Sequence, residues 1–566
     1  MKRVSMLLAA AAVCLYGCTR SAVPTAKLEP GLTGSGGCSD AEFEAKRAAL
    51  LAKPRHIMTD NDGNDIVYYD RNRPVTEEAF IDARIGYVAK TKASTMIYCP
   101  WSAGFGHFTV PGVGDLYTGY CPYANTTNRT VAFLEQGKNS LQMAIDFCRR
   151  EKREAFLGIR MNDTHDASKA STPLFPQWKK DNPDCLFGTF EKKPNRCAWS
   201  AVDFENPKTR DRMLTFMRQF LEKFDVDGIE YDFFRHCQLF KSVAWTTDEA
   251  SSRATQAQLD IMSGFMAQLR ALSEEFGRKR GKPILVAVRV PDSFRYNLCV
   301  GIDLKTWLEQ KSVDIVIGGG YWQFHPWHET AEKVHALGGK FYVSLDESRI
   351  GWNVRAYRLG FLPGRSGLAF YAARMAAAIA EGADGVCFFN CQGGSLAAYA
   401  SVDPTATEGI SKAYFAVERG SGGYVPQSFI FNGQRFSTMP TLDPVKPHEL
   451  EPGETYAFTI AVGDDFEAPA AKAAPPTATA KALVNYVTAP QGAALAVNGR
   501  KLAAPAFASS NPTNGVFTFE VPLAALKRGQ NEFAFTAPAT PPAKGKPALI
   551  DFVLNLNYPK RKGAAK

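Results

Sequence analysis

The sequence lacks several features that would assign it to common functional classes. After the N-terminal leader, no stretch is long and apolar enough to form a transmembrane helix. Its 66 lysines and arginines exceed the acids and give a net charge of +9, but they are spread along the chain and form no basic arm. No CxxC pair or histidine cluster has the spacing of a zinc site, and no GxGxxG turn indicates a dinucleotide site. We therefore expect no metal, no cofactor and no nucleic-acid partner.

The composition is that of a folded protein with more than one domain. Of the 566 residues, 45% are apolar and 22% are charged, which is typical of globular chains. A chain of this length exceeds the size at which a single hydrophobic core stops growing. We expect two domains, and the sequence does not indicate an oligomeric state.

Residues 1–18 have the pattern of an export signal. Two basic residues precede an apolar run over 4–15, which is too short for a permanent membrane span. The run ends in Leu-Tyr-Gly-Cys18, which resembles the lipobox of bacterial lipoproteins and implies that Cys18 receives the lipid; cleavage that leaves Cys18 unmodified is the alternative. In that resemblance Thr19 implies delivery to the outer membrane. We expect a cell-envelope protein that contacts the membrane only through its lipid, with 19–51 as a tether and N-terminal helix.

Short apolar segments alternate with amphipathic ones over residues 52–420, which is the pattern of a parallel α/β sheet. Eight such β–α units predict a (β/α)8 TIM barrel with loop insertions. A doubly wound sheet is the alternative, but its phosphate-binding turn is missing after the first strand. The predicted strands are Arg55–Thr59, Thr95–Cys99, Ala155–Arg160, Gly228–Asp232, Ile284–Val290, Val313–Ile317, Lys340–Leu345 and Gly385–Phe389.

The C-terminal part has a different sequence pattern. Alternating, turn-punctuated segments over 421–560 predict a β-sandwich, within which 467–480, rich in Ala, Pro, Thr and Lys, is predicted to be a flexible insertion. Residues 561–566 form a basic tail. All eight tryptophans lie before this domain, so a structural role is favoured over glycan binding.

Since export permits disulfides, we also expect the bridges Cys185–Cys197 and Cys99–Cys121.

The segment Asp227-Gly-Ile-Glu230-Tyr-Asp232 carries the strongest chemical signal. Alternate residues of a strand point to the same side, so Glu230 and Asp232 share a face. If that face is the barrel interior, burial and mutual repulsion separate the two pKa values, and one group stays protonated while the other is ionised. The alternative is an interior ion pair of these acids with Arg160, Arg235 or Arg289.

The same segment resembles a motif of known families. Asp227-Gly-Ile-x-x-Asp232 on a fourth strand is similar to the family 18 chitinases and, more closely, to the bacterial lipoproteins called family 10-like glycosyl hydrolases. The resemblance implies a TIM barrel that acts on a carbohydrate and covers about 52–420. Phe234 stands where the chitinases have their catalytic glutamate, so their N-acetyl-assisted mechanism is not implied here.

Glycoside cleavage normally needs a second carboxyl group across the sugar. The seventh strand ends in Asp346 and Glu347, and pairing of a fourth-strand acid with a seventh-strand acid resembles a large clan of retaining glycosidases. Glu347 is therefore the leading partner for Asp232, with Asp346 beside it. Asp292, after the fifth strand, is the reserve candidate. Either acid could instead cap a helix or serve a turn.

Further polar and aromatic residues follow the predicted strands and are candidates to bind the substrate. Hydrogen-bonding groups are expected to contact sugar hydroxyls, and aromatic faces are expected to cover a pyranose ring. Structural roles in turns, loops or the core are the alternatives for each. An EF-hand over 60–71 is excluded because Arg71 stands where its glutamate is needed. The candidates are Asp62, Trp101, Arg160, Asn162, Arg235, His236, Tyr321 and Trp322, and His165 is a weaker one.

These observations predict a glycoside hydrolase that cleaves O-glycosidic bonds of an extracellular poly- or oligosaccharide, with Asp232 and Glu230 central. Two alternatives stay open. One is a glycan-binding lipoprotein that has lost catalysis, and the other is a polysaccharide lyase on the same barrel. The sequence does not indicate which sugar or linkage is used.

Overall fold

The computed structural model describes residues 39–559, apart from 102, 122–123, 169–172, 248–252, 320–322, 324, 347–366, 391–393, 417–441, 443–446, 512–513 and 541–544. The predictions for the leader, Cys18, Tyr321, Trp322 and Glu347 lie outside the described residues. No helix within the described part of the chain is both long enough and apolar enough to span a membrane.

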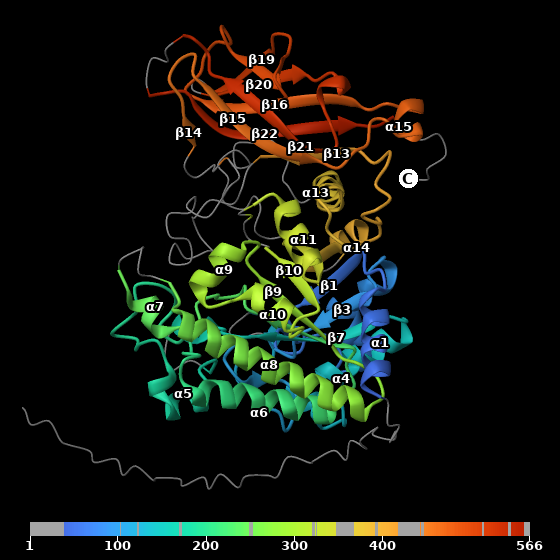
Figure 1. Cartoon of the computed structure of the whole chain (residues 1–566), viewed down its shortest axis with the longest axis vertical. Helices are drawn as coiled ribbons and strands as arrows, with labels where there is room; N and C mark the ends of the chain where they lie inside the picture. The colour runs from blue at the N-terminus through green and yellow to red at the C-terminus, as the bar shows by residue number, and fades with distance from the viewer. Residues whose placement is uncertain are drawn as a thin grey trace, which may run out of the picture.

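Eight parallel strands form a closed barrel, as the sequence predicted (Figure 1). The order around the barrel is β1-β12-β11-β10-β9-β8-β7-β3, so each strand lies beside its sequence neighbour among the barrel strands. This confirms the TIM barrel. The strands are β1 Ile57–Asn61, β3 Thr95–Tyr98, β7 Glu154–Arg160, β8 Gly228–Asp232, β9 Leu285–Val290, β10 Ile315–Gly318, β11 Lys340–Asp346 and β12 Gly385–Phe389.

Helices follow the strands and cover the outside of the barrel (Figure 1). Side-chain caps begin several of them: Asn206 precedes Pro207 at the start of α6, and Thr255 forms a capping box with Gln258 in α8. The helices of this part are α1 Asp40–Leu51, α2 Glu77–Arg84, α3 Thr130–Leu134, α4 Ser140–Arg150, α5 Gln177–Asp181, α6 Pro207–Lys223, α7 Lys241–Trp245, α8 Gln256–Lys279, α9 Phe294–Val300, α10 Leu304–Glu309, α11 Trp327–Ala336, α13 Leu368–Ala380 and α14 Gly394–Tyr399. Two short pairs, β2 Tyr69–Asp70 with β6 Thr126–Thr127 and β4 His107–Phe108 with β5 Asp115–Leu116, brace the loops.

The barrel interior changes from apolar to charged along the strands. Its apolar part is a buried cluster that includes Met58, Ile97, Phe156, Ala287, Ile317, Tyr342 and Cys387. Because side chains alternate along a strand, the interior residues that follow are Asp60 on β1, Arg160 on β7, Glu230 and Asp232 on β8, and Arg289 on β9. The interior is therefore charged at its C-terminal end.

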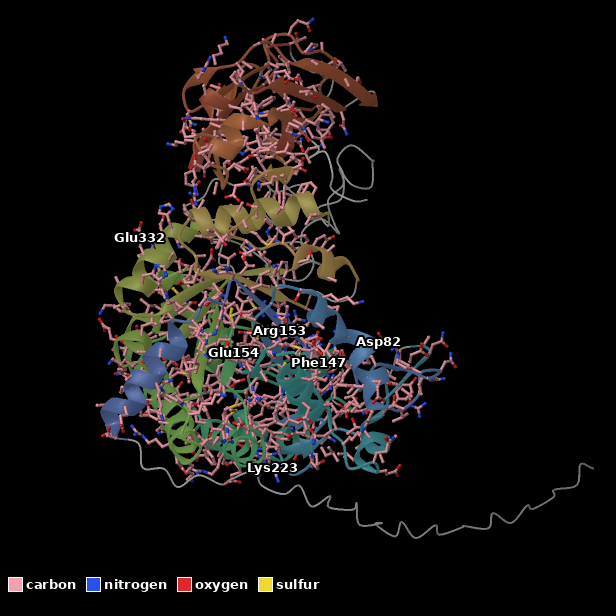
Figure 2. All side chains as sticks on the ribbon, turned by 90° about the vertical axis from the view of Figure 1, so that its right-hand side faces the viewer. Asp82, Phe147, Arg153, Glu154, Lys223 and Glu332 are labelled. Carbon is pink, nitrogen blue, oxygen red and sulfur yellow. The ribbon has the colours of Figure 1, made fainter. Side chains whose placement is uncertain are left out.

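The opposite, N-terminal end of the barrel has a partly buried ion pair. Glu154, which begins β7 and is labelled in Figure 2, accepts hydrogen bonds from Arg55 Nε at 2.6 Å and Arg55 Nη2 at 2.9 Å. Thr95 Oγ1 also donates to Glu154 over 2.8 Å. In a TIM barrel this end serves stability, and the pair joins the first three strand regions there.

The C-terminal region consists of two antiparallel sheets, which confirms the predicted sandwich after the barrel. One sheet has the order β13-β22-β16-β20-β19, with β14 beside β22, and the other has the order β15-β21-β17-β18. Phe552 of the first sheet packs against Phe458 and Phe533 of the second, with ring centroids 4.8 and 5.1 Å apart. The elements are β13 Lys412–Phe415, β14 His448–Glu449, β15 Thr455–Val462, α15 Pro469–Ala473, β16 Thr477–Asn485, β17 Ala494–Val497, β18 Arg500–Lys501, β19 Ala506–Asn511, β20 Asn514–Glu520, β21 Gly529–Thr536 and β22 Ala548–Asn557.

Two predictions about this region need correction. β13 pairs with β22, so the C-terminal sheet recruits residues before the predicted boundary at 421. The predicted flexible insertion over 467–480 contains α15 and the beginning of β16, which pairs with β20 and β22. Alanines at 478, 480 and 482 are buried in alternation, and their small side chains gave too weak an apolar signal.

The helix α13 connects the two parts. It lies between the barrel and the sandwich in Figure 1, and it is buried on several sides because most of its residues are apolar or alanine. Just after α13, Glu381 accepts a hydrogen bond from Gln530 Nε2 of β21 over 2.7 Å. The sandwich is therefore docked onto the barrel through this helix.

The two expected disulfides are absent among the described cysteines, all eight of which are free. Cys99 Sγ lies 2.9 Å from the backbone oxygen of Trp101, and Cys121 Sγ lies 2.8 Å from Thr126 Oγ1. Cys185 and Cys197 are likewise unbridged. The loops expected to depend on these bridges are held by hydrogen bonds and packing instead.

Candidate functional site

Three carboxyl groups and two guanidinium groups gather inside the barrel at the C-terminal ends of the strands. The acids are Asp60, Glu230 and Asp232, of which none is more than 5% exposed. On β7, Arg160 lies opposite Asp232 in the strand register, and on β9, Arg289 lies opposite it on the other side. The predicted shared face of Glu230 and Asp232 is thus the barrel interior.

Asp232 is held by two donors. Arg289 Nη1 donates to Oδ2 over 3.0 Å, and the backbone N–H of Arg235 donates to Oδ1 over 3.0 Å. The Arg289 guanidinium also lies 3.5 Å from the ring centroid of Phe389 and 4.9 Å from that of Phe234. The ion-pair alternative for Asp232 is therefore realised with Arg289, and the pair places a carboxylate in a fixed position near the barrel mouth.

Glu230 lies one layer deeper on the same strand. Its Oε1 is buried and has no hydrogen-bond partner among the described residues. Burial raises the pKa of Glu230 well above its ordinary value, and the negative charges of Asp60 and Asp232 raise it further. The surroundings of Glu230 therefore favour its protonated form.

Asp60 is the third member of this cluster. Burial raises its pKa to about 7, with a further contribution from Asp232, although Arg289 and Arg160 oppose the shift. The strand that carries Asp60 is separated from β8 by β3 and β7, so its carboxyl group approaches from another side of the interior. The cluster thus combines two carboxyl groups of raised pKa with Asp232, which accepts a hydrogen bond from Arg289.

Asp62 and Arg160 belong to an ion-pair network beside this cluster. Arg160 Nη1 donates to Asp163 over 3.1 Å, and Nη2 lies 3.8 Å from Asp62. Arg84 Nη2 donates to Asp62 over 2.9 Å. These contacts orient both predicted sugar-binding residues at the strand ends.

Two other residues that were predicted to contact the sugar make their contacts within the protein. Both amide hydrogens of Asn162 are used by the backbone oxygens of Val202 and Gln238, at 3.0 and 2.7 Å. Trp101 is only 2% exposed and stacks on Tyr117, with ring centroids 5.0 Å apart. For both residues the structural alternative describes the observed packing better than sugar binding does.

A second polar cluster lies at the ends of β7 and β8. His165 Nδ1 lies 2.8 Å from Asp163 Oδ2, and its Nε2 lies 2.9 Å from Arg235 Nη2. Burial would raise the pKa of Asp163, but His165 and Arg160 hold it well below its ordinary value. Burial lowers the pKa of the neighbouring His236, which is therefore neutral at pH 7.

Of the predicted partner acids, Asp292 is described. It follows β9, is 1% exposed, and its backbone oxygen accepts from Thr330 Oγ1 over 2.9 Å. A Cβ built on Gly318 would lie 3.5 Å from the Cβ of Asp292, so Asp292 sits beside the end of β10. The partnership of Asp232 with Asp292 or Glu347 stays a prediction.

Sequence reasoning missed the roles that Asp60 and Asp163 take in these clusters. Asp60 directly follows the first predicted strand, but only Asp62 of that segment was predicted to contact a sugar. The available signal was its alternation with Met58, which places Asp60 on the interior face. For Asp163 there was no such signal, because it lies in a loop beyond β7.

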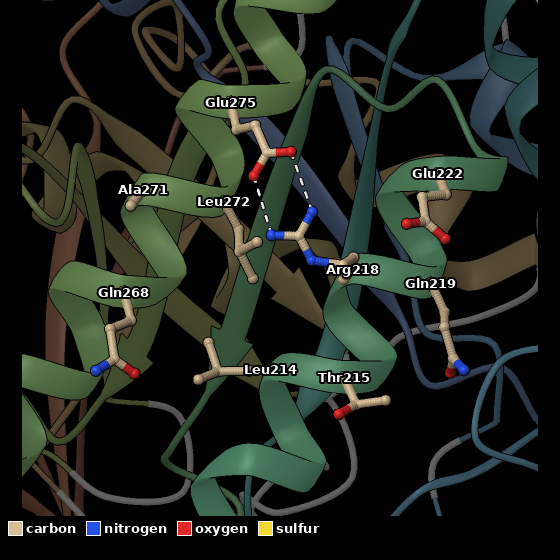
Figure 3. A pocket seen from close by; sticks show the side chains of 9 residues that line it. All are labelled: Leu214, Thr215, Arg218, Gln219, Glu222, Gln268, Ala271, Leu272 and Glu275. Carbon is tan, nitrogen blue, oxygen red and sulfur yellow. Dashed lines mark hydrogen bonds and ion pairs between the residues drawn. The ribbon is translucent and has the colours of Figure 1, made fainter.

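A groove also lies on the outside of the barrel, and it differs in kind from these buried polar clusters. It encloses about 500 Å³ between α6 and α8 and is bridged by Arg218, whose guanidinium donates twice to Glu275 at 3.0 Å (Figure 3). Its walls are helix side chains such as Leu214 and Leu272. Active sites of TIM barrels lie at the strand ends, so this groove is not the candidate site.

No family model and no curated protein matches this chain. Similar solved structures include the PgaB (BpsB) glycoside hydrolase domain from Bordetella bronchiseptica, with 12% identity over 59% of this chain and 94% of that one and a TM-score of 0.36. An alpha-L-fucosidase isoenzyme 2 from Paenibacillus thiaminolyticus has 12% identity over 64% and 52%, with a TM-score of 0.37. An Anoxybacillus alpha-amylase has 10% identity over 86% and 98%, with a TM-score of 0.35. A likeness this distant carries no argument about chemistry, which rests on the site itself.

Proposed function

We propose that this protein is a glycoside hydrolase that cleaves O-glycosidic bonds of a poly- or oligosaccharide outside the cytoplasm. The observation that carries the proposal is the cluster of Asp60, Glu230 and Asp232 at the C-terminal end of the barrel interior. This end forms the active site in TIM-barrel enzymes. Glycoside cleavage needs one protonated and one ionised carboxyl group, and the raised pKa values of Asp60 and Glu230 beside the arginine-bound Asp232 support that pairing.

In this proposal Asp232 is the ionised group. The hydrogen bonds from Arg289 and from the Arg235 backbone hold its carboxylate in place, so it can act on the sugar as a nucleophile or as the base that activates water. Asp60, with its pKa raised to about 7, supplies the proton. Glu230 lies beneath them and, by holding its own proton, limits the negative charge in the cluster. Asp292 and Glu347 remain the alternative partners of Asp232.

The proposed substrate contacts surround this cluster. Asp62, Arg160, Arg235 and His236 follow the strand ends and carry hydrogen-bonding groups for sugar hydroxyls. Tyr321 and Trp322, which follow β10 in the sequence, are proposed as stacking surfaces. These contacts would orient a sugar ring over Asp232.

We also propose that the protein is an envelope lipoprotein of the kind to which its fourth-strand motif is similar, the family 10-like glycosyl hydrolases. The support is the leader followed by Cys18 together with the Asp227-to-Asp232 segment. Cys18 would carry the lipid that tethers the barrel to the outer membrane. Labelled fatty acid incorporated by the wild type but not by Cys18→Ala would test the anchor.

The test of the activity is incubation of the purified protein with plant, marine and bacterial glycans, followed by measurement of new reducing ends and of unsaturated sugar. We expect reducing ends without unsaturated product from the wild type, and loss of the new reducing ends in Asp232→Asn. A matched control is His335→Asn, which alters an exposed Asp384 ion pair away from the strand ends.

Two outcomes of this experiment would contradict the proposed hydrolase activity and favour an alternative function. Unsaturated product would indicate a lyase, for which the Asp163–His165 pair provides a base. Glycan binding without any product from the whole panel would indicate the non-catalytic lipoprotein.

A further inference from the structure

Three metal-ligating side chains converge beside the candidate site. Asp163 and His165 follow β7, and His236 follows β8. Their ligand atoms all lie within 4.8 Å of one another. Asp163 is 2% exposed, and its carboxylate is 2.8 Å from His165 Nδ1. The topology therefore brings one carboxylate and two imidazoles from neighbouring strand ends to one point.

The two imidazole rings have the spacing expected of ligands that share an ion. Their centroids are 5.4 Å apart and their planes are inclined by 78°. Zinc–nitrogen bonds are about 2.0–2.1 Å long, so two rings that bind one tetrahedral ion have centroids roughly 5 Å apart.

His236 provides an independent observation. Its Nδ1 is buried without a hydrogen-bond partner in the described part of the chain. Its backbone has φ of 62°, a left-handed conformation that is uncommon for residues other than glycine. A buried polar atom without a partner needs an explanation, and a ligand that completes the cluster supplies one.

We propose that Asp163, His165 and His236 bind a divalent transition-metal ion of the zinc class. Two imidazoles with one carboxylate suit such ions, whereas calcium and magnesium prefer oxygen ligands throughout. Three protein ligands leave a coordination position open, where a water molecule or a sugar hydroxyl can bind. This inference departs from the expectation of no metal, because the ligands come from two separate loops.

Arg235 contacts one of the proposed ligands and must move when an ion binds. Its Nη2 faces His165 Nε2 at 2.9 Å, so without an ion the ring proton resides on Nδ1 and points at Asp163. An ion on Nδ1 moves the proton to Nε2, where it meets a second donor, and Arg235 must then turn away. Arg235→Gln provides an acceptor oxygen and removes a positive charge. It should therefore tighten metal binding, as acceptors behind metal-bound histidines do.

The experiment is calorimetric titration of the purified chain, previously stripped with a chelator, with zinc chloride, together with thermal midpoints. We expect one ion per chain, a higher midpoint with zinc, and affinity lowered by roughly tenfold or more in His236→Asn and His165→Ala. Asn tolerates the left-handed backbone at 236, and His165 is partly exposed, so both variants should fold. His335→Asn is the control, because its Asp384 pair has no third ligand among the described residues.

The readouts need no glycan, so they stand independently of the proposed activity. Absence of zinc binding by the stripped wild type overturns the proposal. Unchanged affinity in the folded His236→Asn and His165→Ala variants also overturns it, because the ion would then bind elsewhere.

Discussion

Arg289 on β9 and Asp232 on β8 form an ion pair inside the barrel, with Nη1 and Oδ2 separated by 3.0 Å and both side chains almost fully buried. The guanidinium is also covered by the Phe389 ring. Neither charge can be solvated by bulk water, so each depends on the other. The same pair therefore contributes to the stability of the barrel and holds the proposed catalytic carboxylate in place.

Asp232→Asn should abolish most activity and destabilise the fold. Loss of a positioned catalytic carboxylate costs roughly a hundredfold or more in rate. Removing the charge of Asp232 from beside the buried Arg289 guanidinium costs about 3–5 kcal/mol of unfolding free energy. Turnover on an identified glycan and denaturant unfolding measure the two effects. Near-normal turnover in the folded variant would place the chemistry on another residue.

The double variant Asp232→Asn with Arg289→Met separates stability from chemistry. It removes both charges, so it should be more stable than Asp232→Asn alone. Its activity should remain low because the carboxylate is still missing. Recovery of turnover together with stability would contradict the role of Asp232.

The raised pKa of Asp60 predicts the pH dependence. If Asp60 supplies the proton, kcat/KM should fall as the pH rises through about 7, and Asp60→Asn should remove this limb along with most of the rate. The raised pKa of Asp60 also fixes the direction in which folding stability changes with pH. The contribution of Asp60 is complete below its ordinary pKa of 3.8 and is lost as the pH rises through about 7.

Asp60→Asn should therefore gain stability relative to the wild type as the pH rises from about 4 to about 7. Thermal midpoints of the wild type and Asp60→Asn across that range measure the difference. A wild-type kcat/KM that stays flat through pH 7 would assign the proton to another group, such as Asp292 or Glu347.

Asp227→Asn should lower stability more than turnover. Asp227 precedes β8 at the N-terminal end of the barrel, where it accepts from Arg149, Lys282 and the backbone N–H of Ala155. Burial opposes its ionisation, but these donors hold its pKa below the ordinary value. Its stabilising contribution is present above pH 4 and is lost as the pH falls through the lowered pKa.

The midpoints of wild type and Asp227→Asn should therefore differ at pH 7 and converge as the pH falls through the lowered pKa of Asp227. Comparison with Asp232→Asn on the same substrate separates the two ends of β8. A strong loss of turnover in Asp227→Asn at an unchanged midpoint would contradict the assignment of Asp227 to the stability end.

The barrel was predictable because strand periodicity is a local property. The range Gly228–Asp232 agrees between sequence and structure, and alternation alone places Glu230 beside Asp232 on one face. The environment of these acids was not predictable in the same way. The pKa of Asp60 depends on Arg289 and Asp232 from distant strands, and only the closed barrel brings their charges together.

Loop residues were the least predictable part of the site. Asn162 has the polar chemistry of a sugar contact, yet its amide binds the backbone of two other loops. His165 and His236 carried little signal separately, because their convergence depends on the neighbouring positions of β7 and β8. Contacts between loops are set by the three-dimensional arrangement of strand ends, which no short sequence window contains.

Ala480→Asp tests the strand β16 where the sequence predicted a flexible insertion. Ala480 is fully buried and pairs with Phe519 and Leu554, so a carboxylate there would lie in the core of the sandwich. We expect a loss of about 3 kcal/mol or more, or failure of the domain to fold. Lys472→Asp in α15 is the control, because Lys472 is exposed and should change stability by less than about 0.5 kcal/mol. Equal unfolding free energies of both variants and the wild type would mean that residues 467–480 contribute nothing to the sandwich core.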